Sequence, residues 1–134
     1  MRGIVTEMAG PEANLWAAAR KSLPPKTFAT RIENKHGGGV PDVHIVWDGK
    51  PFWIELKVCK HNAVAVRPEQ VAWNTAYWAR GGRTYYLVRH SRTKVLHLFE
   101  GSQGAALALS GLSGAEGHEF RTFPALWEHI GARF

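Results

Sequence analysis

Cysteine is almost absent from this chain of 134 residues, because Cys59 is its one thiol. A single cysteine can neither close an intrachain disulfide nor build a cysteine-based zinc site, which excludes a disulfide-stapled scaffold. The seven histidines show no HExxH or similar spacing, so a zinc hydrolase finds no support, and no GxSxG nucleophile motif occurs. We therefore expect a reducing, cytoplasmic setting.

Long apolar runs are missing as well. None approaches the roughly 20 residues of a membrane-spanning helix, and the first residues, MRGIVTEMAGPE, carry only a short apolar stretch with a glutamate in it, unlike a secretion signal. We expect no membrane partner.

Acidic residues are scarce beside basic ones, 11 against 17, and the formal net charge is +6. This balance favours a polyanionic partner such as nucleic acid.

What remains is the composition of one compact domain. With 45% apolar and 21% charged residues, the chain can bury a core and does not have the composition of a disordered segment, and its length leaves little room for a second domain. The periodicities predict α/β class, with a mixed central sheet flanked by helices. Helices are expected at 11–22 and 68–80, and strands at 27–33, 40–47, 51–58, 83–90 and 94–99.

The last part of the chain is harder to assign. The predicted elements form a core of about residues 11–99, and residues 100–134 form a C-terminal extension within the same domain. Five glycines lie between 101 and 117, which favours one short Ala/Leu helix followed by a loop. A last helical turn or two is expected at 124–130.

The dipeptide Asp48-Gly49 separates two alternating segments and predicts a tight hairpin turn. In that register, paired residue numbers add up to 97, so Asp42 lies opposite Glu55. Because side chains alternate between the two faces of a strand, one face of the hairpin is apolar and must cover a core. The other face carries Asp42, His44, Trp53, Glu55 and Lys57.

Two carboxylates that face each other across a ladder repel one another. A divalent cation would offset the repulsion, and an oxygen-lined site suits Mg²⁺ or Mn²⁺. Lys57 lies two residues after Glu55 and points to the same face. The alternative is a solvated sheet face with an ordinary Glu-Lys neighbour pair.

The motif formed by Pro41-Asp42, twelve further residues and Glu55-Leu56-Lys57 resembles the signature of the PD-(D/E)XK nuclease superfamily. The longer run GGGVPDVHIVWDGKPFWIELKV, followed by RPEQVAWNTAYWARGG, is similar to the VRR-NUC and phage-type branch, which is akin to archaeal Holliday-junction resolvases. The resemblance covers roughly residues 12–98. It implies a restriction-endonuclease-like αβββαβ core.

The resemblance also implies roles for individual residues. Asp42 and Glu55 would bind the metal, with the main-chain carbonyl of Leu56 as a third ligand. Lys57 would orient or deprotonate the attacking water, or stabilise charge on the phosphate. Gln70 matches a glutamine that helps to organise the centre in this branch, although a plain surface helix residue would look the same.

An acidic residue of the first helix is a further metal ligand in some members of the superfamily. Glu12 matches it, and Glu7 is the rival for that role. The alternative for Glu12 is a favourable interaction with the helix dipole, because acidic residues are common in a first helical turn.

Basic residues near the motif are candidate phosphate contacts. They are Arg31, Lys35, His36, Lys60, His61 and Arg67. Ordinary basic surface loops would show the same pattern, and Arg31 could instead pair with Glu33. Trp73, Tyr77 and Trp78 on the second helix are expected in the core or in an interface.

Together these patterns predict a Mg²⁺- or Mn²⁺-dependent nuclease acting on DNA, an endonuclease in preference to an exonuclease, and structure-selective or weakly sequence-selective. A bacterial or phage-encoded cytoplasmic protein is expected, and a homodimer is left open. One alternative is a nucleic-acid-binding module without catalysis. The other is an interaction subunit of a replication or recombination complex.

Overall fold

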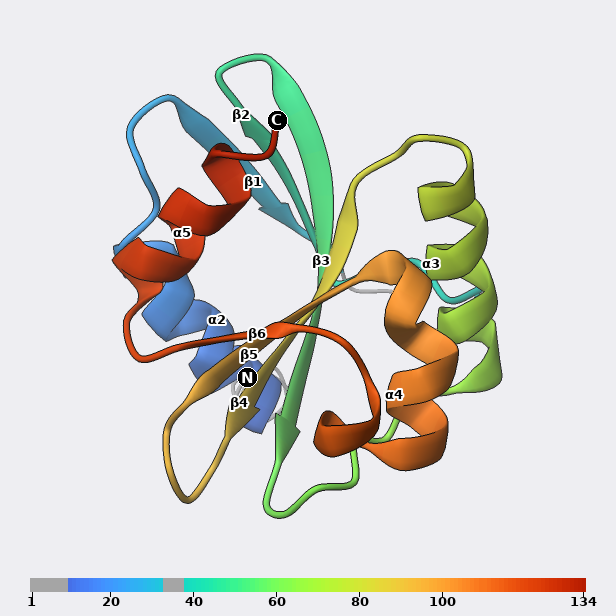
Figure 1. Cartoon of the computed structure of the whole chain (residues 1–134). Coiled ribbons are helices and arrows are strands. Elements are labelled where there is room, and N and C mark those ends of the chain that lie inside the picture. Colours follow the sequence, from blue (N-terminus) through green and yellow to red (C-terminus); the bar gives the residue numbers. More distant parts are fainter. Residues whose placement is uncertain (1–9, 33–37) are drawn as a thin grey trace, which may run out of the picture.

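The protein is described by a computed structural model that covers residues 10–32 and 38–134. Its centre is a six-stranded sheet in which the strands follow one another in the order of the sequence, β1 to β6 (Figure 1). Neighbouring strands are antiparallel except for β3 and β4, which are parallel. The strands are β1 (Thr27–Arg31), β2 (Val43–Trp47), β3 (Lys50–Cys59), β4 (Thr84–His90), β5 (Leu96–Glu100) and β6 (His118–Phe120).

Helices cover both faces of the sheet (Figure 1). On one face, α2 (Pro11–Lys21) and α5 (Phe123–Gly131) pack over the larger apolar core. On the other, α3 (Pro68–Ala79) and α4 (Gly104–Ser110) cover the smaller one, and the 3-10 turns η1 (Gly101–Gln103) and η2 (Leu112–Gly114) flank α4. The predicted α/β class with a mixed, helix-flanked sheet is confirmed.

The hairpin between β2 and β3 has the predicted turn and register. Asp48 and Gly49 both have positive φ, 50° and 84°, as a two-residue turn of this kind requires. Trp47 pairs with Lys50 and Val43 with Ile54, so paired numbers add up to 97. The alternation holds as well, because Val43, Ile45, Phe52, Ile54 and Leu56 all belong to the larger core.

Helix α3 makes the crossover between the two parallel strands β3 and β4. Parallel neighbouring strands need such a crossover, because the chain must return from the end of one strand to the start of the next, at the other end of the sheet. The helix begins at Pro68, whose fixed φ suits a first helical position. It ends before Gly81, which has a φ of 90° and turns the chain back into β4. The crossover thereby places α3 on the face of β3 that carries Glu55.

The observed elements differ from the predicted ones mainly at their ends and in the extension. The first strand stops at Arg31 and the second starts only at Val43, so Asp42 precedes the strand instead of lying within it. Within 101–117, the expected short helix is followed by η2, and β6, a strand that was not predicted, comes directly afterwards and pairs with β5. Three largely exposed residues are too few to show an alternating pattern. Within the described ranges, no helix is both long and apolar enough to cross a membrane.

Candidate active site

The polar face of the β2–β3 hairpin lies beneath α3. Glu55 and Lys57 project from the middle of β3, and Asp42 lies just before β2. The Asp42 Oδ2 atom accepts a hydrogen bond of 2.9 Å from the main-chain amide of Leu56. This bond ties the start of β2 to β3 one step beyond the Val43–Ile54 pair that ends the ladder, and it brings the two carboxylates together, as the register predicts.

Glu55 is an acidic side chain in a buried position, with only 3% of its surface exposed. Its Oε2 atom accepts a hydrogen bond of 2.8 Å from Gln70 Nε2 and lies 3.9 Å from Lys57 Nζ. Its Oε1 atom is buried and has no hydrogen-bond partner among the described residues. A buried carboxylate oxygen is costly unless it shares a proton with the neighbouring Asp42 carboxylate or meets a positively charged ligand.

The electrostatics of the pair point the same way. Burial and the negative charge of Asp42 together raise the pKa of Glu55 to about 9, against the opposing positive charge of Lys57. In the absence of a cation, Glu55 therefore holds a proton at neutral pH. A divalent cation would replace that proton, and two carboxylates form the hard donor set that Mg²⁺ and Mn²⁺ prefer. The residues present thus fit a magnesium or manganese ion.

Gln70 connects Glu55 to Lys57. Its Nε2 atom donates to Glu55, while its Oε1 atom accepts hydrogen bonds from Lys57 Nζ at 2.9 Å and from the main-chain amide of Arg67 at 3.0 Å. The last bond caps the start of α3. The amide of Gln70 is therefore fixed at both ends, and the ammonium group of Lys57 is held beside the carboxylates without a close ion pair.

The turn of α3 that carries Gln70 is anchored to the sheet by buried polar groups. Asn74 Nδ2 donates to the Gln70 carbonyl oxygen at 2.8 Å, and Thr84 Oγ1 donates to Asn74 Oδ1 at 2.6 Å. The hydroxyl of Tyr86 donates to the same carbonyl at 3.3 Å. Sequence reasoning missed these three residues. The only signal was that Asn74 lies four residues after Gln70, on the same side of the helix.

Gly39 lets the loop before Asp42 run against the start of α3. It is buried and has a φ of 77°, and a Cβ atom there would collide with the main-chain carbonyl of Glu69. Only glycine combines that conformation with so close an approach. The contact fixes the loop that leads into Asp42, a role that the sequence did not assign to this glycine.

The remaining predicted residues lie around this centre or outside the described ranges. Glu12 occupies the first turn of α2. Among residues 10–32 and 38–134, no group of three or more His, Cys, Asp or Glu side chains lies close enough together to share one metal ion, so Glu12 does not add a third side chain to the pair formed by Asp42 and Glu55. The predicted residues that fall outside the described ranges are Glu7, Glu33, Lys35 and His36.

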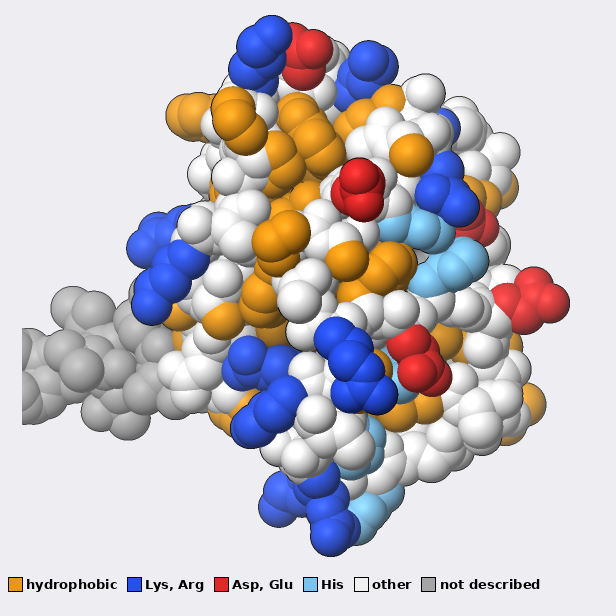
Figure 2. Space-filling model, turned by 60° about the vertical axis from the view of Figure 1, so that its left-hand side comes forward, with side chains coloured by type: hydrophobic (Ala, Val, Ile, Leu, Met, Phe, Trp, Pro, Cys, Tyr) orange, Lys and Arg blue, Asp and Glu red, His pale blue; other side chains and the backbone are white. Residues whose placement is uncertain are grey.

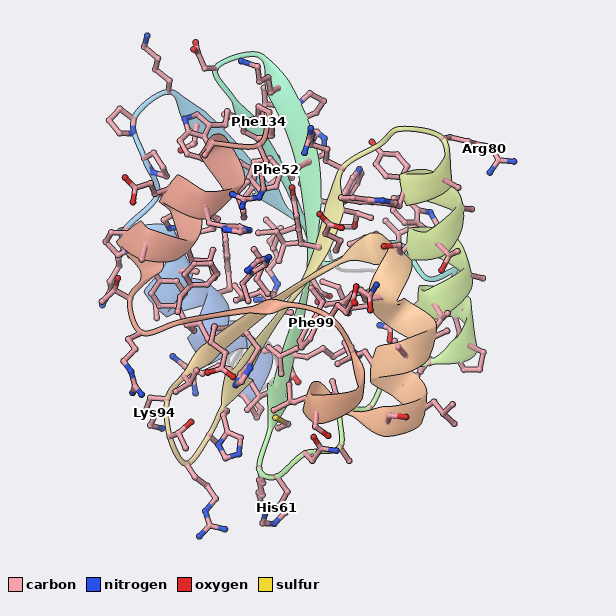
Figure 3. All side chains as sticks on the ribbon, in the orientation of Figure 1. Phe52, His61, Arg80, Lys94, Phe99 and Phe134 are labelled. Atoms are coloured by element: carbon pink, nitrogen blue, oxygen red, sulfur yellow. The ribbon has the colours of Figure 1, made fainter. Side chains whose placement is uncertain are left out.

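The other predicted phosphate contacts are spread over the chain. Arg31 ends β1 and is half-buried. Lys60 and His61 are exposed in the turn after β3, and His61 lies at the far end of that turn (Figure 3). Arg67 precedes α3 and pairs with Glu69 at 3.0 Å. Of these residues, Arg67 is the one connected to the carboxylates by hydrogen bonds, because its main-chain amide donates to Gln70, which in turn donates to Glu55.

Fold and site together define the class of molecule: a resolvase-like α/β fold with paired acidic residues and a lysine on one sheet face. Among solved structures, the chain is similar to Hjc, a Holliday junction resolvase from the archaeal hyperthermophile Archaeoglobus fulgidus. The TM-score is 0.55 and the identity 18%, and the match covers 92% of this chain and 98% of that one. The predicted similarity to archaeal Holliday junction resolvases is thus confirmed for the fold. No protein-family model and no curated protein sequence matches the chain.

Proposed function

We propose that this protein is a metal-dependent nuclease that hydrolyses phosphodiester bonds within DNA and selects its substrate by structure. The observation that carries the proposal is the buried Glu55 carboxylate. One of its oxygens has no hydrogen-bond partner among the described residues, and the other is joined through Gln70 to Lys57. A folded protein retains such an arrangement when the missing partner is a ligand.

The metal-binding residues in this proposal are Asp42 and Glu55, with the main-chain carbonyl of Leu56 as a third donor. When bound, Mg²⁺ or Mn²⁺ lowers the pKa of a water molecule and neutralises charge that develops on the phosphate. Asp42 is oriented by the amide of Leu56 and Glu55 by Gln70. Both carboxylates are therefore positioned before any ligand arrives, which reduces the cost of assembling the site.

Lys57 supplies the positive charge and the proton donor or acceptor of the proposed reaction. Its side chain is 14% exposed, and its ammonium group is held by Gln70 Oε1. One bond to a neutral amide leaves the other protons of the ammonium group for the attacking water or a phosphate oxygen. Lys57 therefore acts best where negative charge grows during cleavage.

The preference for DNA structure over sequence rests on charge and on the fold. The net charge is +6, and on the side of the molecule that Figure 2 shows, Lys and Arg side chains lie along the left edge and at the upper and lower ends. Dispersed positive charge attracts the DNA backbone without regard to sequence. The similar solved structure is a Holliday junction resolvase, which makes branched DNA the first substrate to test.

The test is cleavage of labelled junctions, flaps, duplexes and single strands with Mg²⁺ or Mn²⁺, with and without a chelator. Cleavage should require the metal, and Asp42→Asn should abolish it while weakening Mn²⁺ binding in calorimetry. Asp48→Asn is the matched control, because Asp48 is exposed in the hairpin turn and its positive φ suits asparagine. Unchanged Mn²⁺ affinity in Asp42→Asn, or DNA binding without cleavage of any substrate, would refute the proposal.

A further inference from the structure

An aromatic row continues the candidate active site along β3 and α3, which run in opposite directions. At the first level, Glu55 of β3 meets Gln70 of α3. At the second level, Trp53 meets Trp73, with 5.6 Å between ring centroids and an interplanar angle of 73°. Trp53 lies two residues before Glu55 and therefore on the same face of β3. The same strand and helix thus carry a polar pair, Glu55 and Gln70, followed by an aromatic pair, Trp53 and Trp73.

The row is extended on both sides of this tryptophan pair. His44 lies across the ladder from Trp53, with ring centroids 4.5 Å apart. Tyr77 stacks on Trp73 at 4.8 Å with an interplanar angle of 17°. All four side chains are only half-buried. Gly82 packs directly beneath the Tyr77 ring, where a Cβ atom would collide with it, so the end of the row is fixed in place.

Beyond Tyr77 the row opens into a cavity of about 300 Å³ at the start of β3. Pro51, two residues before Trp53, lines it together with Tyr77, and Lys50 and Arg83 line it as well. Both cations lie over the ring of Phe134, at 5.9 and 5.6 Å from its centroid, and Phe134 lies near the start of β3 (Figure 3). Phe134 packs on Phe52 of the larger core, so the Lys50–Arg83 pair lies at the end of the sheet on the opposite face. Lys57 is the cation on the face of the aromatic row.

We propose that this row, His44, Trp53, Trp73 and Tyr77, binds unpaired nucleotides of the strand that is cut, from the phosphate at Asp42 and Glu55 toward the cavity. The inference rests on the proposed nuclease function and names its substrate more closely. Aromatic faces beside a cation are the chemistry that holds single-stranded nucleic acid, because bases stack on the rings while the cation meets a phosphate. A purely apolar protein partner would leave the ammonium group of Lys57 without a counterpart.

The spacing of the levels excludes paired bases as the occupant. Alternate residues of a strand lie about 7 Å apart, roughly double the 3.4 Å between stacked bases of one DNA strand. Bases held on successive levels must therefore be separated from each other, which a duplex does not allow. A flap, or a strand frayed at a branch point, provides such nucleotides.

The first experiment uses the unchanged protein and altered DNA. A branched DNA with a single-stranded oligothymidylate arm is bound in Ca²⁺, and abasic residues replace the bases one by one on either side of the mapped cleavage position. Abasic residues on one side should weaken binding by about 5- to 150-fold, the range for losing one stacked base. Those on the other side should not. Equal affinity for all of these substrates would overturn the proposal.

The second experiment changes the row. Trp73→Leu should lose the sensitivity to abasic residues, and Trp73→Phe should retain it, because phenylalanine still offers an aromatic face. Trp78→Leu is the matched control: it makes the same substitution on the same helix, at a residue packed against Tyr85 and the larger core. If Trp73→Leu and Trp78→Leu respond alike to every substrate, the row serves only to pack α3 on the sheet.

The two proposals can fail separately. Metal-dependent cleavage without any effect of abasic residues would leave the nuclease intact and refute the nucleotide track. Loss of affinity at abasic residues in a protein that cleaves nothing in Mg²⁺ or Mn²⁺ would refute the nuclease and leave a single-strand binding surface.

Discussion

Replacing Glu55 by glutamine should stabilise the metal-free protein at neutral pH. The pKa of Glu55 is raised from its ordinary value to about 9, first by burial and then by the charge of Asp42. A group with a raised folded-state pKa takes up a proton on folding at any pH between its unfolded and folded pKa values. Its contribution to stability is fully present below about 4.5 and declines as the pH rises toward about 9. Glutamine keeps the shape and does not titrate.

The size of the effect follows from the pH interval. Each pH unit between the two pKa values removes about 1.4 kcal/mol, so moving from about pH 5 to about pH 7.5 removes about 3 kcal/mol from the wild type and not from Glu55→Gln. For a domain of this length, that corresponds to a change in unfolding temperature of roughly 10 °C. Other groups titrate in both proteins, so the difference between the two pH profiles isolates Glu55.

The assay is thermal unfolding of both proteins in chelator across this pH range, repeated with Mn²⁺. The stability gap should widen with pH in chelator. Mn²⁺ at about 100 times its Kd should then add about 2.7 kcal/mol to the wild type, and far less to the variant. Parallel pH profiles in chelator would show that Glu55 is charged without a cation, which would refute the reasoning from its burial and from its unpaired oxygen.

Three further results are expected. Lys57→Ala should slow single-turnover cleavage by about 10²–10⁴-fold while DNA binding in Ca²⁺ falls little, and Lys57→Arg should not fully restore the rate; a wild-type rate in Lys57→Ala would remove its catalytic role. DNA affinity should fall with salt by about 0.9 logarithmic units per phosphate contact, and a flat profile would contradict binding through charge. Gly39→Ala should cost about 1–3 kcal/mol in urea unfolding, because the new Cβ meets Glu69; an unchanged midpoint would show that the loop can move.

The centre of the site could be predicted from the sequence because its geometry is local. One turn dipeptide, Asp48-Gly49, and the two-residue period of the strands place Asp42, Glu55 and Lys57 on one face, and the observed register agrees. No knowledge of the rest of the fold is needed for that step. The same local logic predicted the apolar face that covers the larger core.

What local sequence patterns did not yield depends on how distant segments dock. Gln70 was expected only from the family resemblance, because its contact with Glu55 requires that α3 lie over β3. Asn74, which was not expected, fixes that position through Thr84 of another strand. Glu12 shows the reverse case: its place in a first helical turn was predicted, but the packing of α2 on the opposite face of the sheet keeps it from joining the carboxylates.

Gln70 has a consequence for the metal that can be tested separately. An ammonium group within reach of a carboxylate normally forms a close ion pair, yet Lys57 Nζ stays 3.9 Å from Glu55 Oε2, because Gln70 Oε1 holds it at 2.9 Å. In the proposed site, the amide acts as a spacer that would leave the carboxylate for a cation and the ammonium group for a phosphate.

Gln70→Ala should therefore weaken Mn²⁺ binding although it removes no metal ligand, because Lys57 could then pair closely with the Glu55 carboxylate and compete with the cation for it. In the double variant Gln70→Ala/Lys57→Met no ammonium group is left to move, so Mn²⁺ affinity should return. Calorimetry on the four proteins of this cycle measures the coupling directly. If the double variant binds Mn²⁺ as weakly as Gln70→Ala, the glutamine acts only by capping α3 through the amide of Arg67, and the spacer role is wrong.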